Sequence, residues 1–386
     1  MLDTIVLMLP RSDFRIRYPE RFSPNAEAMF KMHPGRGPQK AIYNPTTAEK
    51  RTGYKPRLTL VRSPATGAVV LKVEFSAPKI LFGNNFQELT PDDLPVFVRK
   101  LKAAMADMGI ITTIGDLQHA HVSAIHYSKN ILLDRATPCS LLIRELQKID
   151  LNAKLDVANA TFRNGGLAVR YHASSYEIAF YDKVKDLEQV RAYGDKRGME
   201  TEYDGQRNLF HQRPQKPEVL RFEVRLQLAK LKTLFKHLGI KRSLTLDGLF
   251  NATTARAVLM HYWQEVTEGL YALELDTGSS ETLLHSIRHA FPRRRISGQM
   301  QLMAFARVVQ EHGLRGGRLL LSLKPHQFYR LKNDLKAAAA HASNPRHTVL
   351  AAIKSELKEF IPLTADELGL IIPSFPDPQQ EAKKNS

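Results

Sequence analysis

The segment EVLRFEVRLQL, at residues 218–228, decides how we interpret the fold. Its residues alternate in character, which is typical of a β-strand whose two faces meet different surroundings. Phe222, Val224 and Leu226 fall on an apolar face, and Arg221, Glu223 and Arg225 fall on a charged one. The charged face suits a solvated surface with local ion pairs, or an active-site floor where Glu223 holds a metal and the arginines hold phosphate.

A second strand-like segment, SYEIAFYDKVKD at residues 175–186, precedes it in the chain. Strand alternation puts Tyr181 and Lys183 on one face, so an ammonium would lie beside a phenol. It could favour the ionised phenol, or neutralise a phosphate that the phenol attacks. Alternatively, Tyr181 packs at a sheet edge and Lys183 is a solvated charge.

The rest of the N-terminal half predicts an α+β fold. We expect strands at residues 1–10, 57–61, 68–76 and 119–133, and a hairpin over 160–182 that turns at Asn164-Gly165-Gly166. Capped amphipathic patterns predict helices at 90–109 and from Thr137 onward. Residues 11–57 are rich in Arg, Lys, Pro and Gly without a sustained period, which indicates a long basic loop.

From about residue 229 the pattern becomes helical. This shift predicts a mainly antiparallel-sheet domain over 1–230, a helical domain over 231–372 and a flexible tail over 373–386.

Composition restricts the function. The chain has 386 residues, with 56 Lys plus Arg against 39 Asp plus Glu, so its net charge is +17 and attraction to polyanions is expected. A single cysteine, Cys139, excludes a disulfide scaffold and a Cys-rich zinc site, and it favours a reducing cytoplasm. We expect no membrane partner, since no apolar run is long enough to cross a bilayer.

Histidines and a glutamate are candidate metal ligands. His119 and His121 share a face of an unbroken strand, while His126 faces the other side. Such residues suit a divalent ion, but isolated strand histidines are more often core or surface residues. Glu74 is a similar candidate on the strand at 68–76.

Four blocks, taken together, resemble the rolling-circle replication initiators of filamentous phages, the gene-two protein family within the HUH-type endonucleases. The blocks are MLDTIVLMLP at 1–10, VEFSAPKILFGNNFQEL at 73–89, IAFYDK at 178–183 and VLRFEVRL at 219–226. They occur in the family's order and span about residues 1–230. The resemblance implies an HUH-like nuclease domain with an antiparallel sheet flanked by helices, followed by a mostly helical domain.

The resemblance also implies a reaction. Tyr181, assisted by Lys183, would attack one phosphodiester of origin DNA, forming a 5′-phosphotyrosine and a free 3′-OH that primes synthesis. The metal, Mg²⁺ or Mn²⁺, would be held by His126 and Glu223, and Glu74 stays a further candidate ligand from its place on the strand at 68–76. Expected partners are double- and single-stranded origin DNA and a host helicase and polymerase. Alternatives are an HUH transposase or relaxase, or a non-catalytic origin- or single-strand-binding protein.

We also predict the residues that hold DNA. Those in the first domain are Arg221, Arg225 and Lys129; those in the helical domain are Arg293, Arg294, Arg295, Lys324 and Arg330. The helical-domain residues lie among aromatic and other basic residues, a mixture that suits phosphate contacts with base stacking. A helix at 299–312, a connector GLRGG and a helix from 325 predict a helix-turn-helix variant or, equally, a helical bundle with a basic solvated face.

Overall fold

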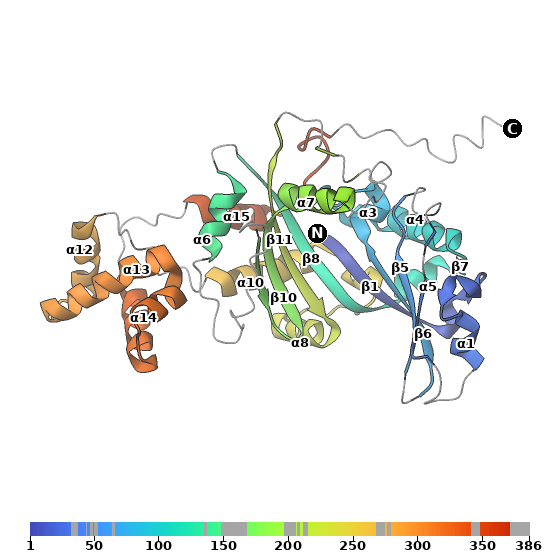
Figure 1. Cartoon of the computed structure of the whole chain (residues 1–386), viewed down its shortest axis with the longest axis horizontal. Helices are drawn as coiled ribbons and strands as arrows, with labels where there is room; N and C mark the ends of the chain where they lie inside the picture. The colour runs from blue at the N-terminus through green and yellow to red at the C-terminus, as the bar shows by residue number, and fades with distance from the viewer. Residues whose placement is uncertain are drawn as a thin grey trace.

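The centre of the molecule is a nine-stranded antiparallel sheet with the order β3-β4-β5-β6-β1-β8-β11-β10-β9 (Figure 1). This computed structural model describes residues 1–370 except 32–37, 44, 47–48, 50–52, 64–65, 135–136, 148–167, 197–205, 207–208, 211–214, 268–274, 276–278 and 341–347. The strands are β1 (Leu2–Pro10), β3 (Phe22–Ser23), β4 (Lys40–Tyr43), β5 (Arg57–Arg62), β6 (Val69–Ser76), β8 (His121–Leu133), β9 (Ala168–His172), β10 (Tyr176–Asp182) and β11 (Glu218–Gln227). A separate small ribbon pairs β2 (Arg15–Ile16) with β7 (Ile110–Ile111).

Helices cover the sheet and form a separate lobe. Those around the sheet are α1 (Ala26–Lys31), α3 (Ala77–Phe82), α4 (Leu94–Asp107), α5 (Ile114–His119), α6 (Cys139–Gln147), α7 (Lys183–Lys196), α8 (Leu228–Leu238), α9 (Leu246–Leu249), α10 (Ala252–Thr267) and α15 (Thr348–Glu359). The lobe contains α12 (Ser280–Ala290), α13 (Ile296–Leu320) and α14 (Pro325–Ala339). Short 3-10 turns are η1 (Arg11–Asp13), η2 (Pro19–Arg21) and η3 (Pro91–Asp93). The α+β class and the helical C-terminal part are therefore confirmed.

The alternation of β11 produces two different sheet faces, as predicted. On the apolar face, Phe222 stacks on Phe180 of β10 with ring centroids 4.5 Å apart, and Trp263 of α10 meets both rings edge-on. On the other face, Arg221 and Glu223 are each only 1% exposed. The charged face at this point is thus buried, and the solvated-surface alternative is wrong for these two residues.

Two predicted segments differ from the structure. Residues 11–57 are not one loop, because they include β2, β3, α1 and β4, whose apolar residues Phe22, Met29 and Tyr43 are buried. The strand predicted at 119–133 begins instead at His121, since α5 takes up residues 114–119. A capping box between Thr113 and Asp116 starts that helix.

Helices that lie across or after the predicted boundary at residue 230 share one hydrophobic core with the sheet. Leu231, Val258 and Ile353, from α8, α10 and α15, belong to the same core as the strands. The lobe has a core of its own, which includes Phe305 and Leu331. The predicted domain boundary stays a prediction, and the predicted tail from 373 and the turn at 164–166 lie outside the described residues.

The lobe helix α13 is broken once. Gly313 has φ 73° and ψ 170°, so it separates a helical stretch before it from one that runs to Leu320. The connector predicted at GLRGG is therefore helical after Gly313, and the turn before α14 is formed by residues 321–324. Within the described part of the chain, no helix is both long and apolar enough to cross a bilayer.

Candidate active site

The buried charged face of the sheet brings together residues from three adjacent strands. Tyr181 of β10 pairs with Arg221 of β11, and Arg225 of β11 pairs with His126 of β8. Glu223 lies between the two arginines on the same face. Five of the sequence-predicted site residues therefore lie in one cluster: Tyr181, Arg221, Glu223, Arg225 and His126.

Glu223 is the centre of this cluster. One of its oxygens, Oε2, accepts a hydrogen bond from the Tyr181 hydroxyl at 2.9 Å and lies 3.3 Å from Arg221 Nε. The other, Oε1, lies 2.7 Å from Arg225 Nε and 3.1 Å from His126 Nδ1. Both carboxylate oxygens are thus fully engaged by protein groups.

This arrangement raises the pKa of the Tyr181 phenol and lowers the pKa of the Glu223 carboxyl group. Burial, and then the Glu223 charge, raise the pKa of Tyr181 well above 10. Burial alone would raise the pKa of Glu223 as well, but His126, Arg221 and Arg225 outweigh it and hold that pKa well below 4.5. Tyr181 is therefore a neutral phenol in this state, so of the two roles considered for Lys183, favouring the ionised phenol does not apply here.

Arg221 is held by residues that the sequence did not point to. Its Nη2 lies 2.7 Å from Asp3 Oδ2 and donates to Ser128 Oγ at 3.0 Å. Its Nη1 donates to the carbonyl oxygen of Asn85 at 2.9 Å. Asp3 carried a usable signal, because it is an acidic residue in an otherwise apolar strand. Arg221 is accordingly an internal ion-pair partner, and its guanidinium has no surface on which to meet DNA.

Lys183 lies beside the phenol, although not on the strand. It is the first residue of α7, and its Nζ lies 5.7 Å from the ring centroid of Tyr181 and 5.5 Å from that of Phe86. Burial, and then the charge of Arg221, lower its pKa to about 8. The ammonium is therefore charged below pH 8, and because Lys183 is only 4% exposed, a phosphate can meet it only after the residues around it move.

Other predicted residues lie elsewhere. Glu74 lies on β6, two strands from β8, which at about 4.8 Å per strand is about 10 Å away, and it pairs with Lys72 at 3.1 Å. Lys129 is buried and its Nζ lies 3.0 Å from Glu88 Oε2, so it has no exposed charge with which to meet DNA. His119 ends α5, so the predicted His119–His121 pair on one strand face is wrong.

A second tyrosine of β10, Tyr176, lies five residues before Tyr181 and on the opposite side of the sheet. Tyr176 packs against Tyr262 with ring centroids 5.3 Å apart, and the Nζ of Lys230 lies 4.3 Å from the Tyr176 ring centroid. Strand alternation separates the two tyrosines, because their positions differ by an odd number of residues. Tyr176 is thus no partner for Tyr181 in this arrangement.

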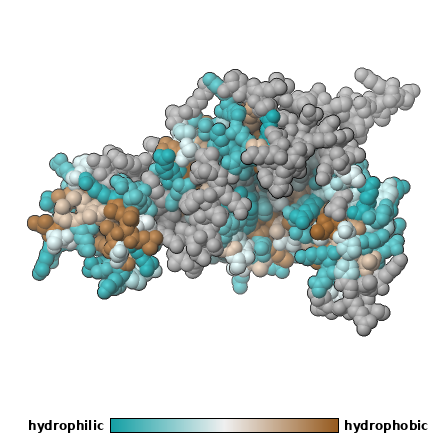
Figure 2. Space-filling model, viewed as in Figure 1, coloured by the Kyte–Doolittle hydropathy of each residue, from teal (hydrophilic) through white to brown (hydrophobic). Residues whose placement is uncertain are grey.

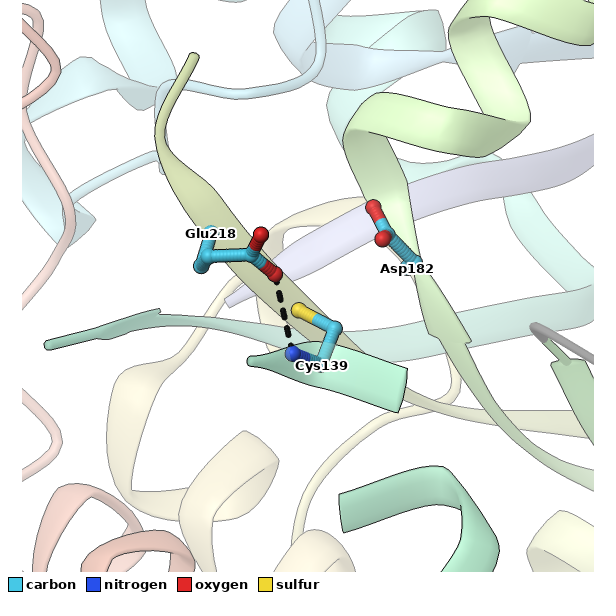
Figure 3. A group of neighbouring side chains, drawn as sticks. All are labelled: Cys139, Asp182 and Glu218. Atoms are coloured by element: carbon cyan, nitrogen blue, oxygen red, sulfur yellow. Dashed lines mark hydrogen bonds between the residues drawn. The ribbon is translucent and has the colours of Figure 1, made fainter. Parts of the chain in front are cut away.

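A second group of potential ligands lies at the end of the sheet. Figure 3 shows Cys139, Asp182 and Glu218, whose ligand atoms all lie within 4.8 Å of one another. Glu218 accepts the backbone N–H of Cys139, and Asp182 accepts those of Val184 and Lys185. The two carboxylates therefore satisfy the first N–H groups of α6 and α7. Burial raises the pKa of the Cys139 thiol, which disfavours the thiolate that a metal requires.

Sequence-predicted DNA contacts in the lobe fall into two groups. Arg294 is paired, with Nη1 2.6 Å from Asp334 Oδ2. Four others are exposed: Arg293 and Arg295 on the turn before α13, Lys324 on the turn before α14, and Arg330 on α14.

Comparison with known proteins does not assign the chain. No protein-family model, curated protein or solved structure matches it.

Proposed function

We propose that this chain is a single-strand DNA endonuclease and strand transferase that starts rolling-circle replication through a covalent link to Tyr181. The observation that supports this most is the hydrogen bond between the Tyr181 hydroxyl and Glu223, within a cluster that also holds His126 and Arg225. Lys183 lies beside the same phenol. A nucleophile, a proton acceptor and cations for a phosphate are therefore in one place.

In this reaction the Tyr181 oxygen bonds to the scissile phosphorus while the bond from phosphorus to the 3′ oxygen breaks. The phosphate stays on the 5′ side as a tyrosyl ester, and the 3′ oxygen leaves as a hydroxyl after gaining a proton. The phenol loses one proton, for which Glu223 is the nearest acceptor. The reverse reaction rejoins the strand, because the ester conserves the bond.

Before DNA binds, the high pKa of Tyr181 and the low pKa of Glu223 oppose proton transfer from the phenol to the carboxylate. A bound substrate must therefore change these pKa values. Arg225 is the most exposed member of the cluster, with 30% of its side chain accessible. A phosphate that draws Arg225 away from Glu223 would raise the pKa of this carboxyl and make it a better acceptor. Since Tyr181 itself is only 5% exposed, the residues that cover it must also move before DNA reaches it.

A divalent ion remains part of the proposal with a smaller ligand set. His126 and Glu223 face each other and suit an ion that takes its remaining ligands from water and substrate phosphate, as Mg²⁺ commonly does. Glu74 is too distant to join them. When bound, such an ion would polarise the scissile phosphate.

A second candidate is a DNA-binding protein without cleavage activity. The burial of Tyr181 and its raised pKa favour this candidate, since both oppose nucleophilic attack.

One assay separates the two candidates. Supercoiled plasmids that carry the DNA flanking the gene for this chain are incubated with the protein and Mg²⁺ or Mn²⁺, and then separated with and without protease. We expect nicked circles with covalently attached protein. Tyr181→Phe should reduce nicking by at least about a thousandfold, because it removes the nucleophile, while leaving DNA binding unchanged. Tyr176→Phe, on the opposite face, is the matched control and should nick normally. Absence of nicking by the unmodified chain, or normal nicking by Tyr181→Phe, would refute the proposal.

A further inference from the structure

A groove on the helical lobe is lined by an unusual concentration of arginines. It is a shallow, open groove of about 740 Å³ between the turn that precedes α13 and the exposed side of α14. Its charged lining consists of Arg293, Arg294, Arg295, Arg330 and Asp334. Four guanidinium groups against one carboxylate give this groove a net charge of +3.

Part of that lining is fixed by contacts within the lobe. The Asp334 carboxylate, 2.6 Å from Arg294 Nη1, neutralises that arginine. Gln299, which is buried, donates to the Arg294 carbonyl oxygen at 3.0 Å. A side chain at Gly298 would collide with Arg294, whose Nε lies 2.9 Å from the position of an added Cβ. Arg294 is therefore a structural support that holds the turn in shape.

The other three arginines point to a ligand outside the chain. Arg293, Arg295 and Arg330 are exposed, and Asp334, the carboxylate within the groove lining, is already engaged by Arg294. Like charges that line one groove repel one another, and a bound anion relieves that repulsion. In the view of Figure 2 the lobe shows both hydrophilic and hydrophobic areas.

We infer that this groove binds the phosphate backbone of duplex DNA. Guanidinium groups match phosphate geometry, and backbone contacts dominate protein–DNA affinity. Single-strand sites usually offer exposed aromatic rings for stacking. The aromatic residue that lines this groove, Phe291, is instead covered by the Arg294 guanidinium, whose Cζ lies 5.2 Å from the ring centroid. This favours the duplex as occupant.

The neighbouring helices fit the same partner. The stretch of α13 after Gly313 is followed by the turn at 321–324 and by α14, so Lys324 is the N-cap of α14 and Arg330 lies in its first half. Basic side chains and helix N-termini commonly contact phosphates in protein–DNA complexes. The inference extends the proposed function, because an enzyme that nicks an origin must also hold the duplex, but it does not depend on Tyr181.

The test compares two triple variants of the full chain that lose the same charge. Arg293→Gln/Arg295→Gln/Arg330→Gln removes the groove charge, and Arg99→Gln/Lys102→Gln/Lys232→Gln removes three exposed charges on α4 and α8. Binding of a labelled 30-base-pair duplex is followed by fluorescence anisotropy at several salt concentrations. The groove variant should bind at least tenfold more weakly at 0.1 M salt, with a slope of log K against log salt shallower by about 2 to 3, since about 0.9 is lost per phosphate contact. The control variant should keep the slope of the unmodified chain.

Further variants and DNA probes identify the ligand of the groove, and they separate this inference from the nicking proposal. Replacing the three groove arginines by lysine should keep most of the slope, and circular dichroism should show that all variants stay folded. Equal losses in the groove and control variants, or a larger loss for a single-stranded oligonucleotide than for the duplex, would overturn the inference. Tyr181→Phe should bind duplex normally, so a chain that binds through the groove but never nicks would refute only the proposed function.

Discussion

The charged cluster on the sheet and the groove on the lobe use the same residue types in opposite ways. On the sheet, Arg221 is buried and its charge is balanced by Asp3 and Glu223. On the lobe, Arg293 and Arg295 are exposed to solvent. The count of 56 Lys plus Arg therefore overstates the number of cations that a polyanion meets, because buried cations such as Arg221 and Lys129 are paired with carboxylates within the protein. Only exposed cations contribute to the salt-dependent binding of a polyanion.

The largest difference between the two regions should appear in stability. Arg221→Met removes a buried cation and leaves two buried carboxylates without their main partner, so we expect the free energy of unfolding to fall by about 3–5 kcal/mol. Arg293→Met, in the groove, should change it by less than about 0.5 kcal/mol. Urea denaturation of both variants provides the measurement. Equal effects at the two positions would show that the distinction between internal and available arginines is wrong.

The sequence predicted the alternation of β11 and the position of Tyr181 at the end of β10, because both depend on local periodicity. It could not predict that Tyr181 bonds to Glu223, since this requires the register between two strands separated by 35 residues, from Asp182 to Glu218. Lys129 was misjudged for a similar reason: its partner, Glu88, is 41 residues away. The error at His119 was avoidable, because Thr113 and Asp116 form a capping box that is visible in the sequence.

Two buried carboxylates extend the comparison within the sheet. Glu223 has Arg221, Arg225 and His126 as neighbours and a lowered pKa, whereas burial, followed by further smaller effects that include repulsion from Glu218, raises the pKa of Asp182 to about 6. The folded state thus binds the Asp182 proton more tightly than the unfolded state, whose pKa is near 3.8. The stability from this proton is complete below pH 4 and is lost as the pH rises to 6.

Asp182→Asn removes this titration but keeps an oxygen that can accept the N–H groups of Val184 and Lys185. At pH 7 the variant should be more stable than the unmodified chain by about 1–3 kcal/mol, and at pH 4 the two should be nearly equal. Urea denaturation at both pH values measures the difference. Asp92→Asn, at an exposed position, is the matched control and should show little change. A variant that is less stable at pH 7 would mean that the charged form of Asp182 is the stabilising one.

The smallest effect is expected at Glu74, an acidic residue on the same sheet that lacks the surroundings of Glu223. Its partner is Lys72 at 3.1 Å, and about a third of each side chain is exposed. Pairs of this kind contribute about 0–1 kcal/mol, so Glu74→Gln should alter stability by no more than that and leave nicking within about twofold. Glu223→Gln, by contrast, should abolish nicking because it removes the acceptor for the Tyr181 proton. If Glu74→Gln abolished nicking as well, while its duplex binding and unfolding stayed normal, Glu74 would have to reach the reacting phosphate or its metal ion. The catalytic site would then extend two strands beyond the cluster around Glu223.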